Sequence, residues 1–129
     1  MSFNTPTENN LISWSTSSAF RIEKDGIYNI QFSAQFANYD NQAHDIDIWF
    51  VVNGSPISWS NSKFSILGTH GGVEGHHIAA WNFMSRFYAN DEIEIYWQTD
   101  DLAVNIEVYS PAYSEPDTPS IILSVNQIV

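Results

Sequence analysis

The chain has 129 residues and no cysteine, so it is long enough for one domain with a sizeable core and cannot depend on disulfide bonds. Its 15 acidic and 4 basic residues give a net charge of −11, which argues against direct binding of nucleic acid or of anionic membranes. No apolar run approaches the roughly 20 residues of a membrane span. The polar start MSFNTPTENN has no signal pattern, so we expect a protein made and used without crossing a membrane.

The first half of the chain predicts a polar lead-in over residues 1–10 and then a series of β-strands. The clearest strand begins at Gly26, where every second residue is apolar and the others are polar. Another strand ends at Asn53-Gly54, a dipeptide typical of tight hairpin turns. The strands expected in this half span residues 10–14, 20–23, 26–36 and 44–53.

The second half continues with strands and a glycine- and histidine-rich loop over residues 68–77. No segment has the periodicity of an amphipathic helix. The strands expected in this half span residues 57–67, 78–88, 92–97, 104–109 and 120–128. Short strands separated by frequent turn signals predict an all-β sandwich or barrel.

Three groups of residues in this order resemble a known fold family. They are Phe20, Gly26 and Tyr28, then Asn53-Gly54, then the run ANDEI at residues 89–93. This order is similar to the trimeric jelly roll of the complement globular head and tumour-necrosis-factor-like families, although those families have a glycine where this chain has Asn90. The resemblance implies an all-β, two-sheet antiparallel jelly-roll sandwich of about ten strands. The jelly roll would span residues 11–129 and assemble as a trimer.

Two further segments resemble a branch of this fold that occurs in virion proteins of tailed bacteriophages. These segments are HGGVEGHHIAAWNF and TPSIILSVNQI. The resemblance places residues 26–36 and 104–109 in an outer sheet. It places residues 44–53, 92–97 and 120–128 in an inner sheet that packs on the three-fold axis.

The faces of these strands that point away from the core differ in polarity. In the two outer strands they are mostly polar, whereas the three inner strands show large apolar side chains there. Exposed apolar groups on one sheet indicate a partner for that sheet. The predicted trimer interface consists of Trp49, Val51, Tyr96 and Ile122.

The loop of residues 68–77 contains three histidines and Glu74, and these residue types could bind zinc or nickel. However, adjacent histidines in an extended chain point in opposite directions, and the glycines leave the ligands unorganised. We therefore expect a solvated loop, or one that caps the three-fold axis, and no metal.

Neither catalysis nor a cofactor is predicted. Asp45, Asp47, Asp100 and Asp101 could bind calcium, but EF-hand spacing is absent and solvated charge is the better interpretation. The chain has no nucleophile motif, phosphate-binding loop or zinc-protease motif.

Surface aromatic residues are the best candidates for ligand binding, because tryptophans can stack on sugars. Trp59 lies between two serines near the Asn53-Gly54 turn, and we expect it to be exposed. Trp81 and Trp97 fall on the buried faces of their strands. The predicted ligand-binding residues are Trp59, His70, His76, His77 and Tyr113.

These expectations favour a homotrimeric phage virion protein that is assembled in the host cytoplasm. The first hypothesis is a capsid decoration (cement) protein that stabilises the particle by contacts with the major capsid protein. The second is a receptor-binding module of a tail fibre or tail tip that recognises host surface glycans. The third is a secreted bacterial adhesion or signalling ligand of the same fold, against which the polar start counts.

Overall fold

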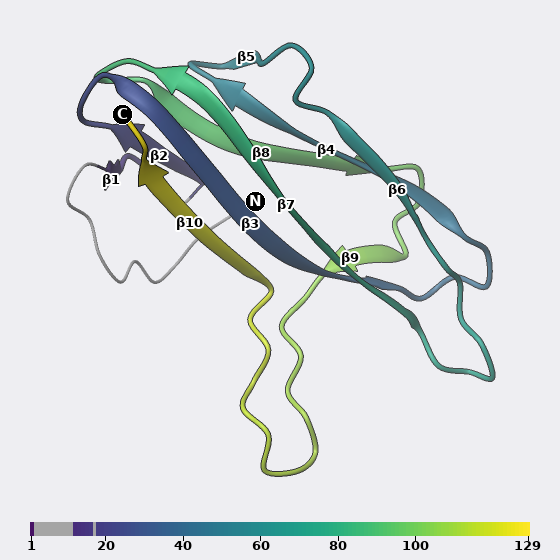
Figure 1. Ribbon diagram of the computed structural model, residues 1–129. Coiled ribbons are helices and arrows are strands. Elements are labelled where there is room, and N and C mark those ends of the chain that lie inside the picture. Colours follow the sequence, from purple (N-terminus) through teal and green to yellow (C-terminus); the bar gives the residue numbers. More distant parts are fainter. Residues whose placement is uncertain (2–11, 17) are drawn as a thin grey trace.

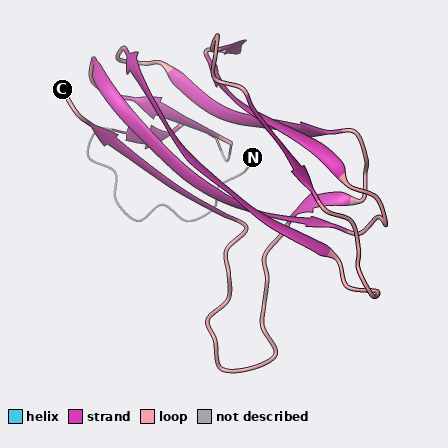
Figure 2. Ribbon diagram, turned by 45° about the vertical axis from the view of Figure 1, so that its right-hand side comes forward, coloured by secondary structure: helices cyan, strands magenta, loops and turns pink. Residues whose placement is uncertain are grey.

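The computed structural model describes Met1, residues 12–16 and residues 18–129, and all regular structure in this part of the chain is β-strand (Figures 1 and 2). Most of the predicted lead-in lies outside the described residues. The described strands are β1 (Ile12–Trp14), β2 (Ala19–Ile22), β3 (Gly26–Asn38), β4 (His44–Val52), β5 (Ser55–Pro56), β6 (Ser62–Ile66), β7 (Gly75–Phe87), β8 (Glu92–Thr99), β9 (Val104–Ile106) and β10 (Ile121–Gln127). A helix long and apolar enough to span a membrane is not found among these residues.

The strands form two antiparallel sheets. One sheet, here called the β4 sheet, has the order β1-β2-β8-β4-β5, and β6 also pairs with β4. The other, the β3 sheet, has the order β10-β3-β7, and β9 pairs with the end of β3 (Figure 1). The prediction of an all-β protein with two antiparallel sheets and about ten strands is therefore confirmed.

The core consists of the alternate residues of both sheets that point inward. In β3 these include Tyr28, Ile30 and Phe32, and they are buried together with the inward residues of β4. Phe50 of β4 stacks on Phe83 of β7, with ring centroids 4.8 Å apart, and meets Phe32 edge-on at 5.9 Å. Each fully buried side chain of this size contributes about 1.5–3 kcal/mol of hydrophobic stabilisation.

The turns explain two features of the sequence. Asn53 and Gly54 both have positive φ, 50° and 82°, as the predicted hairpin turn requires. Asn90 has a φ of 74°, a left-handed value that asparagine tolerates better than most residues. Asparagine can therefore occupy the position where the similar families have glycine.

Three predictions about strands are wrong. Residues 57–67 do not form one strand, because a turn precedes β6. The loop of residues 68–77 is shorter than predicted, because β7 begins at Gly75, where a Cβ atom would collide with the carbonyl oxygen of Leu67. Finally, β10 does not join the sheet of β4 and β8. It pairs with β3, the strand with the clearest alternation, and its own inward residues pack against the core.

Candidate binding groove on the β4 sheet

A groove of about 400 Å³ lies on the outer face of the β4 sheet, beside the turn between β5 and β6. The groove is shallow and open to solvent along much of its length. The groove contains two tryptophans and three side chains with carboxylate or amide groups. Its lining residues are Asp47, Trp49, Pro56, Ile57, Trp59, Asn61 and Gln98.

The turn of residues 57–60 forms one wall of the groove. The backbone N–H of Ile57 donates to the carbonyl of Phe50 at 2.9 Å, and the N–H of Ser60 donates to the carbonyl of Ile57 at 3.2 Å. Trp59 is the third residue of this turn and has a φ of 66°. Turns that need a positive φ at this position usually have glycine or asparagine there.

The backbone conformation of Trp59 lowers the stability of the fold. A left-handed backbone costs a residue with a side chain about 1–2 kcal/mol. The side chain of Trp59 recovers none of this by burial, since the residue is 100% exposed. Folding therefore gives no reason for a tryptophan at this position.

The turn is nevertheless held firmly in place, because Ser60 is buried beneath it. The Ser60 hydroxyl accepts a hydrogen bond from the backbone N–H of Phe50 at 3.0 Å and donates one to the carbonyl of Ile57 at 2.8 Å. These bonds join the turn to β4, so the backbone of Trp59 is fixed relative to the sheet.

The floor of the groove combines an aromatic platform with polar groups. Trp49 of β4 packs on Tyr96 of β8, with ring centroids 5.9 Å apart. The Asp47 carboxylate accepts a hydrogen bond from the Asn61 amide at 2.9 Å. Gln98 of β8 is the register partner of Asp47, so the two side chains leave the sheet side by side on the same face. The groove can therefore offer apolar ring faces together with hydrogen-bond donors and acceptors.

The structure separates the four residues predicted to form the trimer interface. Trp49 and Tyr96 lie on the outer face of the β4 sheet. Val51 is only 2% exposed, because its own chain covers it. Ile122 is exposed on the opposite sheet, since β10 pairs with β3. The expectation that all four share one surface is therefore wrong.

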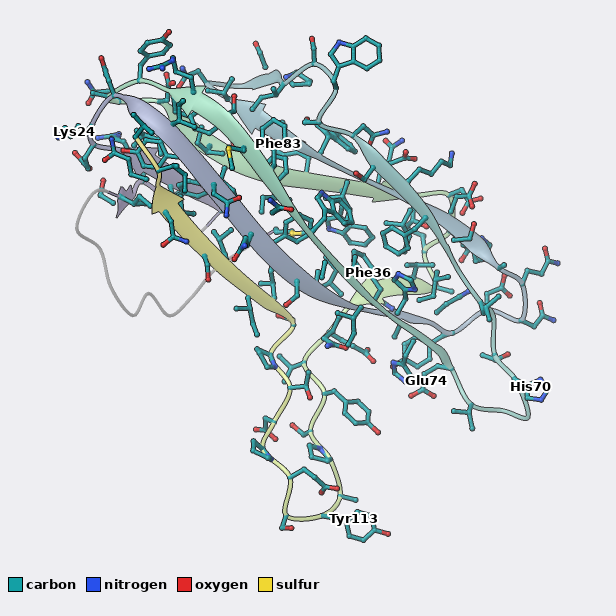
Figure 3. The ribbon with its side chains drawn as sticks, viewed as in Figure 1. Lys24, Phe36, His70, Glu74, Phe83 and Tyr113 are labelled. Atoms are coloured by element: carbon teal, nitrogen blue, oxygen red, sulfur yellow. The ribbon has the colours of Figure 1, made fainter. Side chains whose placement is uncertain are left out.

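The five residues predicted to bind a ligand do not converge either. His70 and Tyr113 lie on separate loops, and Tyr113 is on the long projecting loop between β9 and β10 (Figure 3). Trp59 is on the β5–β6 turn at the other end of the molecule (Figure 1). His76 meets Tyr109 edge-on, at a centroid distance of 5.7 Å, and lies 3.2 Å from Glu74.

His77 stacks on Phe64, with ring centroids 4.6 Å apart. His76 and His77 thus lie on opposite faces of β7, as expected for neighbours in an extended chain. Of the predicted ligand-binding residues, only Trp59 lines the groove. The contributions of Asp47, Asn61 and Gln98 to this groove were not predicted.

A second polar cluster surrounds His44, whose side chain is 11% exposed. One ring nitrogen lies 2.7 Å from the Asp40 carboxylate and the other lies 3.0 Å from Asp100. Asp40, His44 and Asp101 are also close enough together to hold a metal ion. Both ring nitrogens can donate to these carboxylates only when the imidazole is protonated, and a protonated ring offers no lone pair to a metal. The cluster is therefore best described as an ion-pair clasp between the β3–β4 and β8–β9 loops.

The clasp predicts a dependence of stability on pH. The hydrogen bond to Asp40 is the main cause of a raised pKa for His44, and the same bond lowers the pKa of Asp40. Because the His44 pKa is higher in the folded chain, its contribution is complete below the ordinary histidine pKa of about 6.5 and is lost as the pH rises through the folded value. We expect the melting temperature to fall over this interval when it is measured by calorimetry.

His44→Gln provides the matched comparison, because glutamine retains hydrogen-bonding groups but does not titrate. Its melting temperature should change less than that of the wild type as the pH rises above about 6.5. If the melting temperatures of the two proteins depended on pH in the same way, the stabilising role of the ion-pair clasp would be contradicted.

Comparison with known proteins gives no relative from which a function could be transferred: no family model matches the chain, and a search of curated proteins finds no significant similarity.

Proposed function

We propose that the protein is a non-catalytic structural protein on the surface of a phage particle. In this proposal it is a homotrimeric jelly roll that decorates the capsid and stabilises it by contacts with the major capsid protein. The resemblance of its motifs to phage members of the jelly-roll family supports this role. The two antiparallel sheets without a helix among the described residues are consistent with that fold.

The distribution of charge between the two sheets is the observation that carries the assembly part of this proposal. The chain has a net charge of −11, but β3, β7 and β10 contain no acidic residue. By contrast, β4 and β8 contain Asp45, Asp47, Glu92 and Glu94. Copies of an acidic chain repel one another, so they can approach at the lowest electrostatic cost through the sheet whose long strands contain no acidic residue.

We therefore place the trimer contact on the outer face of the β3 sheet. Arg86 is the one residue of its three long strands with a full charge at neutral pH. Ile78, Met84 and Ile122 are exposed apolar residues of the same face. Of the residues predicted from sequence for the interface, this proposal retains Ile122. The number of three copies comes from the family resemblance, although that resemblance puts the sheet of β4 and β8 on the three-fold axis.

A receptor-binding module of a tail fibre or tail tip is the second candidate. The groove on the β4 sheet favours it, because Trp49 and Trp59 offer exposed aromatic surface to a host glycan. The proposed trimer leaves this groove open, because the contact involves the opposite sheet.

Quantitative mass spectrometry of purified particles tests the virion role and distinguishes the two candidates. For a decoration protein we expect a copy number comparable to that of the major capsid protein. A tail protein would be present in only a few copies. A chain that is expressed during infection but does not copurify with the particles would contradict both candidates.

A further inference from the structure

We propose that the groove on the β4 sheet binds a glycan and takes the ring of a neutral hexose, with Trp59 and Trp49 as stacking surfaces. The proposal concerns one site on one chain. It rests on the second candidate function and specifies the ligand of that site, whereas its failure would leave the capsid-decoration role unaffected.

The aromatic geometry is the first argument. A pyranose ring has an apolar face of C–H groups and an edge of hydroxyl groups. The C–H face gains free energy when it leaves water and packs on an aromatic ring. Trp59 is fully exposed, and Tyr96 packs beside Trp49 on the same face, with a centroid distance of 5.9 Å. Both residues line the same groove.

The polar groups beside the two rings are the second argument. Asp47, Asn61 and Gln98 bring a carboxylate and two amides into the groove. Pairs of neighbouring sugar hydroxyls both donate and accept hydrogen bonds. A carboxylate can accept from them, and the adjacent amides can both donate and accept. Hydrogen bonds to the ionised Asp47 would be the strongest of these contacts.

The charge around the groove limits the class of sugar that can bind there. The nearest basic group in the described part of the chain is Lys63, whose ammonium lies 3.6 Å from Asp45 and 3.8 Å from Asp47. Lys63 is therefore already partnered by two carboxylates. An acidic sugar would bring its charge next to Asp47 in a chain of net charge −11. Repulsion should exclude sialic and uronic acids and favour neutral rings.

The backbone of Trp59 is the third and independent argument. A positive φ at a fully exposed tryptophan lowers the stability of the fold, and the side chain does not compensate for this by packing. Strained residues of this kind persist where they serve a function. Asparagine tolerates the same backbone, so Trp59→Asn should relieve strain and remove the stacking surface at once.

Isothermal titration calorimetry on the full chain tests the site with a panel of neutral oligosaccharides: maltotriose, cellotriose, galactotriose and chitotriose. We expect at least one of them to bind the wild type. The same sugar should bind Trp59→Asn about tenfold more weakly or worse, which corresponds to about 1.4 kcal/mol. The melting temperature of Trp59→Asn should equal or exceed that of the wild type, so loss of binding could not be ascribed to unfolding.

Tyr113→Ala is the matched control, because it removes an exposed aromatic residue outside the groove. Its affinity for the sugar should equal that of the wild type. The proposal is overturned if no sugar of the panel binds, or if Trp59→Asn binds as tightly as the wild type. Equal affinity for trigalacturonate, in which every ring is acidic, would refute the preference for neutral sugars. If Trp59→Asn weakens binding to purified capsid protein and no sugar binds, the groove is a protein contact and the glycan proposal fails.

Discussion

Replacing Phe50 with alanine is expected to lower the free energy of unfolding by about 3–5 kcal/mol. Phe50 is completely buried and joins the two sheets, since it stacks on Phe83 and meets Phe32 edge-on. Small domains have total stabilities of about 5–15 kcal/mol, so the variant should be close to unfolding. Urea denaturation followed by circular dichroism measures the change.

Tyr113→Ala is a suitable control for this experiment, because it also removes an aromatic side chain but from an exposed loop. Its free energy of unfolding should change by no more than about 0.5 kcal/mol. If Phe50→Ala costs less than about 1 kcal/mol, the packing between the sheets does not have the importance assigned to it here.

The second large effect is expected for Ser33→Glu, which should dissociate the trimer. Ser33 lies on the outer face of the β3 sheet, between its register partners Ile122 of β10 and Ala80 of β7. A glutamate there would introduce one carboxylate per chain into the middle of a contact whose three long strands contain no acidic residue. Like charges brought together at an interface cost several kcal/mol. Analytical ultracentrifugation should show a shift from trimer to monomer while the circular dichroism spectrum stays unchanged.

Ser110→Glu adds the same charge in the loop between β9 and β10, outside the proposed contact. It should leave the trimer intact. If both variants dissociate, net charge and not the location of the charge controls assembly. If Ser33→Glu remains trimeric, the contact lies on another face.

Much of the fold could be predicted from local patterns. Alternation of apolar and polar residues identified β3 and β8, and Asn53-Gly54 identified the hairpin turn after β4. Alternation does not say which strands are neighbours, however. Ile122 alternates with buried residues in the same way whichever sheet contains β10, so its face could not be assigned before the pairing with β3 was known.

The groove was harder to predict, because three separate segments contribute to it. Only the register between β4 and β8 brings Gln98 opposite Asp47. The sequence did indicate that Trp59 is exposed. It gave no sign of the positive φ, since the run Ser-Trp-Ser lacks the glycine or asparagine that usually marks such a turn.

The mass of the wild-type protein in solution tests the account most directly. Size-exclusion chromatography with multi-angle light scattering, at micromolar concentration, should give the mass of three chains. The same measurement on Ser33→Glu should give the mass of one chain. A wild-type protein with the mass of a single chain under these conditions would contradict the trimer and remove the main support for a structural role in a virion.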